Sequence, residues 1–159
     1  MESSMSQSLR LIALDNEDLA VVSTHLQDAV LKVRDMAYLP RAKRFALVAA
    51  RFDWLSASCG KAERCATGLH FERVLKVAVS GFSQAENDRC LNLLDIEFLP
   101  QDAPAGQVIL TFSGGAAVRL DVECLESQMH DLGPRWPARA TPGHCLDEET
   151  MELNRSKPA

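Results

Sequence analysis

The chain has 159 residues, of which 47% are hydrophobic and 25% charged, and its formal net charge is −5. A globular chain of this length forms one domain and can bury a core without disulfides or metal ions. The net negative charge argues against nucleic acid and anionic membranes as partners, because both bind basic surfaces.

The two ends and the cysteines bear on location and domain organisation. Residues 1–14 contain no basic segment and no long apolar run, so they predict neither a signal peptide nor a membrane span. We therefore expect a cytoplasmic protein, in which an odd count of 5 cysteines indicates free thiols. We expect one domain over residues 9–145, a disordered N-terminus over 1–8 and a mobile polar tail over 146–159.

The first predicted elements are a short strand over residues 9–14 and a helix after it. Asp15 is a suitable N-cap, and acidic residues follow in the first turn, where the helix dipole favours them. An apolar stripe at helical spacing consists of Leu19, Val22, Leu26 and Ala29. The pattern predicts one helix of about three turns with a single buried face.

Residues 29–54 predict a long hairpin whose apolar alternation changes phase within each arm. Pairing residues whose numbers sum to 83 places apolar side chains opposite one another: Tyr38 with Phe45, Met36 with Leu47, Val33 with Ala50, Leu31 with Phe52 and Ala29 with Trp54. In this register both arms change face at one rung, near Arg34 and Ala49.

Two explanations of this change of face remain open. In the commoner case the ribbon bends at a corner of a curled sheet, so that both sets of side chains reach one core. Otherwise the tip of the hairpin leaves the domain and forms an interaction surface. The side chains of this tip surface are Met36, Tyr38, Phe45 and Leu47.

Alternation predicts further strands over residues 69–79, 94–98, 108–112 and 118–122. A three-residue hairpin loop over residues 114–116 would pair Phe112 with Val118 and Leu110 with Leu120.

Residues 124–132 predict a short helical turn, and the proline-rich residues 131–144 an irregular segment. In that segment Arg135 and Arg139 flank Trp136, a pattern that suits either a docking patch or an anchor on the domain. We expect the anchor, with Trp136 buried.

A helix followed by successive antiparallel hairpins predicts an α+β fold. We expect one N-terminal helix packed on a curled, mostly antiparallel, meandering sheet of about six or seven strands, in the form of a half-barrel or roll.

Candidate binding residues are few. Cysteine and histidine spacings match no zinc pattern, and the one glycine pair belongs to a hairpin, so we expect no metal and no cofactor. Arg73 interrupts an apolar strand face, where an unpaired buried charge would cost several kcal/mol. We favour a bulge or edge that turns Arg73 to water. The alternative is a ligand site in which Arg73 and His70 supply polar contacts.

Several stretches resemble one family along most of the chain: "LIALDNEDLAVVSTHLQDAV", "YLPRAKRFALVAARFDW", "GLHFERVLKV", "LTFSGGAAVRLDVECLE" and "DLGPRWPA". They are similar to DUF2948, a family of small alphaproteobacterial proteins of unknown function, over about residues 9–144. The resemblance implies a single domain in a bacterial cytosol. It carries no catalytic motif and no functional residue to transfer.

Two functions follow as hypotheses, and no catalytic residue is identified for either. The leading one is a non-enzymatic interaction domain that binds a protein or a second copy of itself, through the hairpin tip or through Arg135 and Trp136. The alternative is a small-ligand-binding domain or an enzyme with a pocket in the curled sheet.

Overall fold

The structure is a computed structural model that describes residues 8–139. In chain order the strands are β1 (Arg10–Ala13), β2 (Val30–Lys32), β3 (Met36–Leu39), β4 (Arg44–Phe52), β5 (Glu63–Phe71), β6 (Val74–Ser80), β7 (Cys90–Pro100), β8 (Gly106–Phe112), β9 (Ala117–Val122) and β10 (Ser127–Pro137). The helices are α1 (Asn16–His25) and α2 (Trp54–Ala57). Apart from Ser8, the ends expected to be mobile lie outside the described residues.

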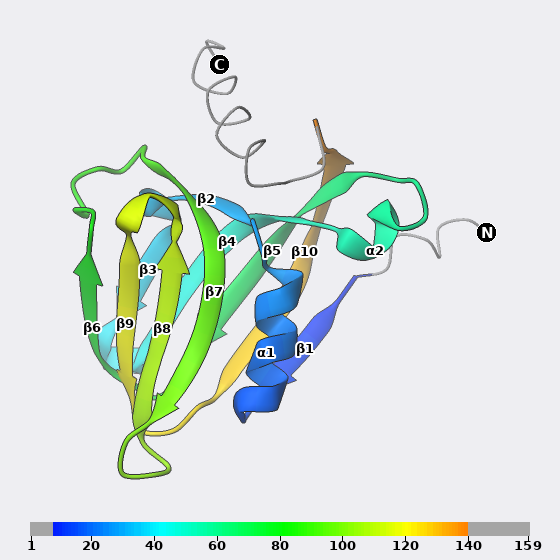
Figure 1. Cartoon of the computed structure of the whole chain (residues 1–159). Helices are drawn as coiled ribbons and strands as arrows, with labels where there is room; N and C mark the ends of the chain where they lie inside the picture. Colours follow the sequence, from blue (N-terminus) through cyan, green and yellow to red (C-terminus); the bar gives the residue numbers. More distant parts are fainter. Residues whose placement is uncertain (1–7, 140–159) are drawn as a thin grey trace.

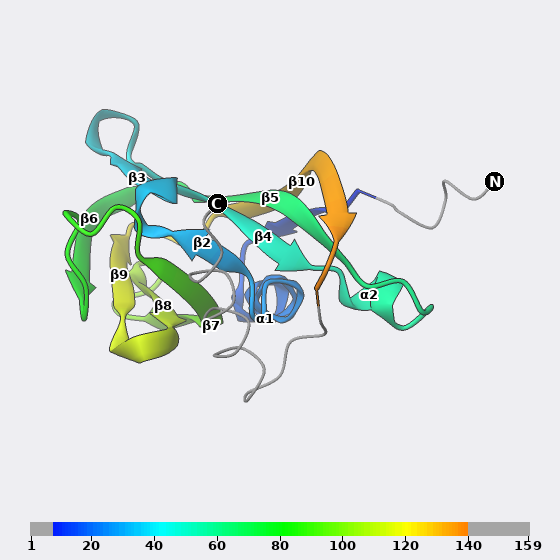
Figure 2. The same cartoon turned by 90° about the horizontal axis from the view of Figure 1, so that it is seen from above.

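One antiparallel sheet of 10 strands runs in the order β1-β10-β5-β4-β2-β7-β8-β9-β6, and β3 pairs with β4 beside this path. The sheet curls until β6, β9, β8 and β7 face β3, β4 and β5 across the core (Figure 1). Seen from above, the curl stays open, and α1 lies between β7 and the β1 end of the sheet (Figure 2).

The expected α+β fold with about six or seven strands is wrong. The residues described form a mostly β structure with one open sheet of 10 strands and two helices. Two segments account for much of the difference. Residues 69–79 belong to two strands, because the chain crosses from one half of the sheet to the other at Glu72 and Arg73.

The second segment is residues 127–137, which form strand β10 where the sequence predicted a helical turn up to residue 132 and an irregular segment from residue 131; residues 140–144 of that segment lie outside the described residues. Its pairing with β5 shifts between Asp131, which pairs with Thr67, and Arg135, which pairs with Cys65. Residues 132–134 are therefore a bulge opposite one residue. Pro134 lies in this bulge and Pro137 at the strand end, where a missing N–H group does least harm to the ladder.

Helix α1 confirms the local signals of the sequence. The Asp15 carboxylate accepts a hydrogen bond of 2.8 Å from the backbone N–H of Asp18. The four side chains of the apolar stripe are all buried: Leu19, Val22, Leu26 and Ala29.

The tip of the hairpin has the expected register, but its base does not. Tyr38 pairs with Phe45 and Met36 with Leu47, as predicted. At the base Ala50 pairs with Val30 and not with Val33, because the first arm contains a 3₁₀ turn over Val33–Asp35. This turn changes the face of the first arm only.

The second arm keeps one face to the core as far as Arg51, and at the strand end Phe52, on the opposite face, is also buried. Its buried positions alternate through Phe45, Leu47, Ala49 and Arg51. A change of face near Ala49 is therefore wrong, and the residue that continues the buried face is an arginine.

The glycine hairpin between β8 and β9 has a three-residue loop, as predicted, but one residue earlier. The N–H of Phe112 donates to the carbonyl of Ala116 over 2.8 Å, which leaves residues 113–115 in the loop. Gly114 and Gly115 have φ of 73° and 80°, which favours glycine at both positions. Leu110 consequently pairs with Val118 and not with Leu120.

Candidate functional site

The inner face of β4, β5 and β10 changes from apolar to charged along the strands. Successive rows across these strands are Phe45, Phe71 and Ser127; Leu47, Leu69 and Met129; Ala49, Thr67 and Asp131; and Arg51, Cys65 and Arg135. Because alternate residues of a strand share a face, the last two rows bring opposite charges together inside the sheet. This end of the sheet lies next to α2 (Figure 1).

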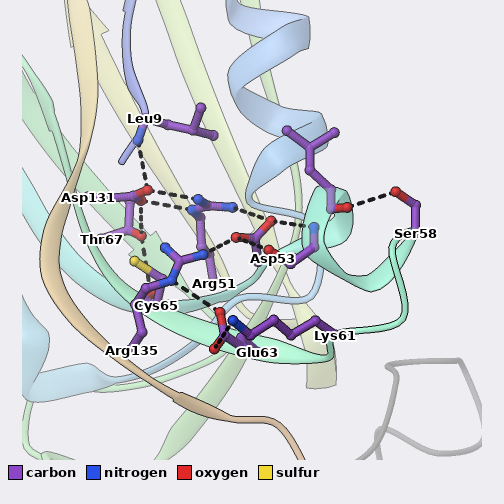
Figure 3. Close-up of polar contacts among 12 residues, drawn as sticks. Leu9, Arg51, Asp53, Ser58, Lys61, Glu63, Cys65, Thr67, Asp131 and Arg135 are labelled. Atoms are coloured by element: carbon purple, nitrogen blue, oxygen red, sulfur yellow. Dashed lines mark hydrogen bonds and ion pairs between the residues drawn. The ribbon is translucent and has the colours of Figure 1, made fainter. Parts of the chain in front are cut away.

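Arg51 and Asp131 form a two-pronged ion pair at the centre of the charged rows. Arg51 Nε and Nη2 donate to the two carboxylate oxygens of Asp131, each over 2.8 Å. The side chains are 1% and 0% exposed. Asp131 also accepts 2.9 Å and 2.8 Å hydrogen bonds from the Thr67 hydroxyl and the Leu9 N–H, as Figure 3 shows. Paired and charge-assisted bonds of this kind are the strongest that side chains make.

A second ion pair joins this centre to α2 and to the surface. Asp53 caps α2 by accepting hydrogen bonds from the backbone N–H and the hydroxyl of Ser56, at 3.0 and 3.1 Å. Arg135 Nη2 donates to Asp53 Oδ2, the oxygen that also accepts from the Ser56 hydroxyl, and Arg135 Nε donates to Glu63 over 3.3 Å (Figure 3). Glu63 also lies 3.8 Å from the ammonium group of Lys61.

These six side chains, named the charge cluster below, balance one another. Its cations are Arg51, Lys61 and Arg135, and its anions are Asp53, Glu63 and Asp131. One donor is left over, since Arg51 Nη1 has no hydrogen bond and lies 4.0 Å from Asp53. With no net charge, the cluster offers little attraction to an ionic ligand.

The surroundings also set the pKa values of the acidic and thiol groups. Burial alone would raise the pKa of Asp131, but the bonds from Arg51, Leu9 and Thr67 outweigh burial and hold this pKa at about 2. Burial also acts to raise the pKa of Asp53, and the bonds from Ser56 and the charge of Arg51 lower it in net effect. Burial, helped by the charge of Asp131, raises the pKa of the Cys65 thiol.

These shifts do not suit acid–base or nucleophilic chemistry. A general acid or base works best with a pKa near the operating pH, and Asp131 is far below it. The raised pKa of Cys65 opposes formation of the reactive thiolate. The charge cluster is suited instead to fixing β4, β5, β10 and α2 relative to one another.

The structure does not bring Arg73 and His70 together around one ligand. Arg73 is exposed in the turn between β5 and β6, with φ of 62°, and its Nε lies 3.5 Å from Glu126. The preference for an arginine turned to water is confirmed. His70 lies on the outer face of β5, where its Nδ1 is 2.8 Å from Glu72.

The hairpin tip packs on the core of the domain. Phe45 and Leu47 are buried, and Met36 and Tyr38 are half-buried against the core cluster. The Tyr38 hydroxyl donates to the carbonyl of Val74 over 3.2 Å, which ties β3 to the start of β6. This placement agrees with a ribbon that bends at a corner of the sheet.

Arg135 and Trp136 point to opposite faces of β10, as neighbours in a strand do. Arg135 points inward to the charge cluster, whereas Trp136 is 40% exposed on the outer face. The expectation of a buried Trp136 is therefore wrong.

A group of exposed apolar side chains, named the outer patch below, lies on the outer face of β1, β4 and β10. Its members are Ile12, Val48, Leu132 and Trp136, with exposures of 60%, 45%, 44% and 40%. Val48 pairs with Gly68, and Gly68 pairs with His130. A Cβ atom on Gly68 would lie 3.6 Å from both His130 and Leu132, so these side chains extend over β5 at this point.

Other features give little chemistry. Cys59, Cys65, Cys90 and Cys124 are free thiols, and Cys145 lies outside the described residues. Among residues 8–139, no three His, Cys, Asp or Glu side chains form a group that could hold a metal ion. Neither described helix is long and apolar enough to span a membrane.

Sequence reasoning missed Arg51 and Asp131, the centre of the charge cluster, and gave Arg135 a different role. The sequence did contain a signal for Arg51. It is the next odd-numbered residue after Phe45, Leu47 and Ala49, so the alternation of the strand places it on the same buried face.

Comparison with known proteins identifies a family. No curated protein matches this sequence. The family model described as "Protein of unknown function (DUF2948)" matches residues 9–144, a range that contains both the charge cluster and the outer patch. The chain belongs to the DUF2948 family.

Proposed function

We propose that this domain is a non-enzymatic protein-binding module that contacts its partner with the outer patch. The observation that carries the proposal is the gathering of four exposed apolar side chains, one of them a tryptophan, on one face of the sheet. Groups of exposed apolar side chains on one face are a feature of protein-interaction sites, and tryptophan is enriched among residues that dominate binding energy.

The surroundings of the outer patch support the same interpretation. Alanine and glycine occupy the neighbouring positions of the central strands, at Ala46, Ala50, Ala66 and Gly68. The small side chains at Ala46, Ala50 and Ala66 give a low surface onto which a partner can pack, whereas His130 and Leu132 cover Gly68. Polar and charged side chains lie between and beside the outer-patch positions: Ile12 pairs with Gln128, Trp136 pairs with Arg64, and at one end Glu72 contacts Arg44 at 2.7 Å. Protein interfaces commonly combine such aromatic and apolar side chains with polar contacts.

The chemistry inside the domain favours binding over catalysis. The ionised side chains of the charge cluster are engaged with one another, and Arg73 and His70 contact separate carboxylates. The acidic composition further supports a protein partner over a nucleic acid.

The test compares two outer-patch variants with a matched control outside the patch. We expect Val48→Lys and Trp136→Ala to fold normally, since both side chains are exposed, and to lose the partner. The control is Leu94→Lys, which places the same charge at an exposed apolar position on β7. The measurement is quantitative affinity purification from the native cell, with the melting temperature of each variant recorded.

A partner recovered by the wild type and by Leu94→Lys, but depleted with both patch variants, supports the proposal. Equal recovery with all four proteins removes the outer patch as the binding site. Absence of any specific partner with the wild type contradicts the binding function itself.

A further inference from the structure

Strand β6 is an open edge of the sheet. It pairs with β9 on one side, and no described strand pairs with its other side. Nothing lies beyond β6 at the left margin of the fold in Figure 1, and Figure 2 shows the same side open. A free edge offers a row of backbone donors and acceptors to another strand.

Strand β6 also lacks the usual protection of such edges. Proteins shorten their edge strands, or place charges and prolines in them, to prevent pairing between molecules. The other terminal strands, β1 and β3, have 4 residues each. Strand β6 has 7, with the sequence VLKVAVS, which contains one charge and no proline.

Contacts at both ends hold β6 in an extended form. At its start the N–H of Val74 donates to the carbonyl of Lys43 over 2.9 Å, beside the bond from Tyr38. At its end, a Cβ atom on Gly81 would lie 2.1 Å from the carbonyl oxygen of Gly115, so the chain passes directly against the β8–β9 loop. The edge is therefore a rigid template, and its ordering costs little on association.

The hydrogen-bonding pattern tells which backbone groups of β6 face outward. Bonded and non-bonded pairs alternate in an antiparallel ladder. Since Phe112 bonds to Ala116 and the β8–β9 register has no shift, the even-numbered residues of β9 bond to β8. The odd-numbered residues of β9 then bond to β6.

Those odd-numbered residues pair with Lys76, Ala78 and Ser80. The N–H and C=O groups of Val77 and Val79 therefore point away from β9, to the open edge. Leu75 is the extra residue of a bulge at the start of the strand and stands outside this regular stretch. The regular stretch is residues 76–80, with Ala78 at its centre.

We propose that β6 pairs antiparallel with β6 of a second copy, about a two-fold axis at Ala78. The backbone N–H and C=O groups of Val77 then bond to those of Val79 in the partner copy, and Val79 bonds in the same way to Val77 of the partner copy. All outward-pointing N–H and C=O groups of residues 76–80 are therefore paired. Ala78 lies opposite its own counterpart, where a small side chain fits the closer, non-bonded spacing. Lys76 lies opposite Ser80, which keeps the two lysines apart.

The side chains also match across this axis. Val77 and Val79 pair within the domain with Leu120 and Val118, both buried, so they lie on the core-facing side. The second copy continues this apolar row with its own valines. Val79 is 38% and Leu75 51% exposed, which is apolar surface that a neighbouring strand would cover.

Neighbouring registers are less favourable. With the axis at Lys76, the two lysines would lie directly opposite each other, which destabilises a strand pair. With the axis at Val77, Val79 would meet the bulged Leu75 instead of a regular strand residue. Registers that pair odd with even residues would place the core-facing valines opposite Lys76, Ala78 or Ser80, which lie on the other face.

This interface is separate from the outer patch, so a second experiment addresses it. The full chain is studied by sedimentation velocity over a range of concentrations, with circular dichroism to confirm folding. We expect a concentration-dependent dimer. Val79→Pro removes an N–H that faces the partner and not β9, so it should abolish the dimer while the monomer stays folded. Val48→Lys, on the outer patch, should leave the dimer intact.

A set of charge variants at exposed positions tests the register and does not depend on the proline variant. Ser80→Lys places lysines opposite Lys76 in both halves, and Lys76→Glu with Ser80→Glu places acids opposite acids. Each should weaken the dimer, and mixing the two proteins should restore association. Lys76→Glu with Ser80→Lys should strengthen it.

Three outcomes overturn the proposal. The first is a wild-type protein that stays monomeric at every concentration. The second is a Val79→Pro variant that is folded and still dimerises. The third is that Ser80→Lys, or Lys76→Glu with Ser80→Glu, associates as strongly as Lys76→Glu with Ser80→Lys. None of these results bears on partner capture by the outer patch.

Discussion

Arg51 is a fully buried arginine whose guanidinium contacts Asp131 through two hydrogen bonds and approaches Asp53. Removal of both charges from water costs several kcal/mol per ion, and only close pairing offsets this cost. Loss of one partner should therefore lower the free energy of unfolding more than loss of both, because it leaves the other charge buried without a counter-ion.

We predict that Arg51→Met lowers the free energy of unfolding by about 3–5 kcal/mol, because it isolates Asp131. Asp131→Leu should cost a similar amount. The double variant should cost much less than the sum, since both charges leave together. Urea unfolding at neutral pH measures all three.

Arg73→Met is the control for this cycle, because Arg73 is exposed and its loss should change stability by less than about 0.5 kcal/mol. Additive costs for Arg51→Met and Asp131→Leu would mean that the ion pair contributes no coupling energy.

At the scale of elements, residues with left-handed backbone lie where helices and strands end. Gly60 follows α2, and Gly81 follows β6, with φ of 86° and 80°. The two positions differ in their surroundings. A Cβ atom on Gly81 would lie 2.1 Å from the carbonyl oxygen of Gly115, too close for the loop to stay in place. At Gly60 a Cβ atom would meet nothing within 4 Å.

We predict that Gly60→Ala lowers the free energy of unfolding by about 1 kcal/mol, the cost of a left-handed alanine. Gly81→Ala should cost about 1–3 kcal/mol more, because the added methyl group forces the β8–β9 loop away from β6. Chemical denaturation of the two variants gives the difference. Equal losses would show that the close approach at Gly81 relaxes freely.

At the scale of the whole molecule, the charge cluster links stability to pH. The pKa of Asp131 is about 2 in the folded state and 3.8 in its ordinary range, so the unfolded chain binds its proton first as pH falls. Its stabilisation is complete above about pH 4 and is lost as pH falls through 2. Asp53, with a lowered pKa, acts in the same direction.

His25 adds to this dependence at higher pH. Burial and the charge of Arg51 lower its pKa, so the unfolded state takes up this proton more readily. Stability from His25 is present above its ordinary value of 6.5 and declines as pH falls below it.

We predict that the free energy of unfolding falls steadily between pH 7 and pH 2, with about 2 kcal/mol of the loss due to Asp131. Asp131→Asn should be less stable at neutral pH and should show a shallower decline below pH 4. Asp102→Asn, in the exposed β7–β8 loop, is the control and should follow the wild type. Parallel curves for Asp131→Asn and the wild type would contradict the assignment. Urea titrations at a series of pH values provide the curves.

By itself the sequence determined the elements whose signals are local. Helix α1 follows from the Asp15 cap and an apolar stripe, and the β8–β9 loop length follows from Gly114 and Gly115. The tip register of the β3–β4 hairpin follows from apolar pairs a few residues apart. Each of these depends on neighbours in the chain, so its pattern is readable without the fold.

Tertiary structure alone decided β10 and the charge cluster. Strand β10 forms because it pairs with β5 and β1, which lie far away in the sequence, and these pairings override its prolines. The alternation along β4 places Arg51 on the buried face, but the local sequence of neither Arg51 nor Asp131 shows which charge is its partner. Only the register of three strands places one opposite the other, because the free energy that buries a charge comes from a partner that local sequence cannot specify.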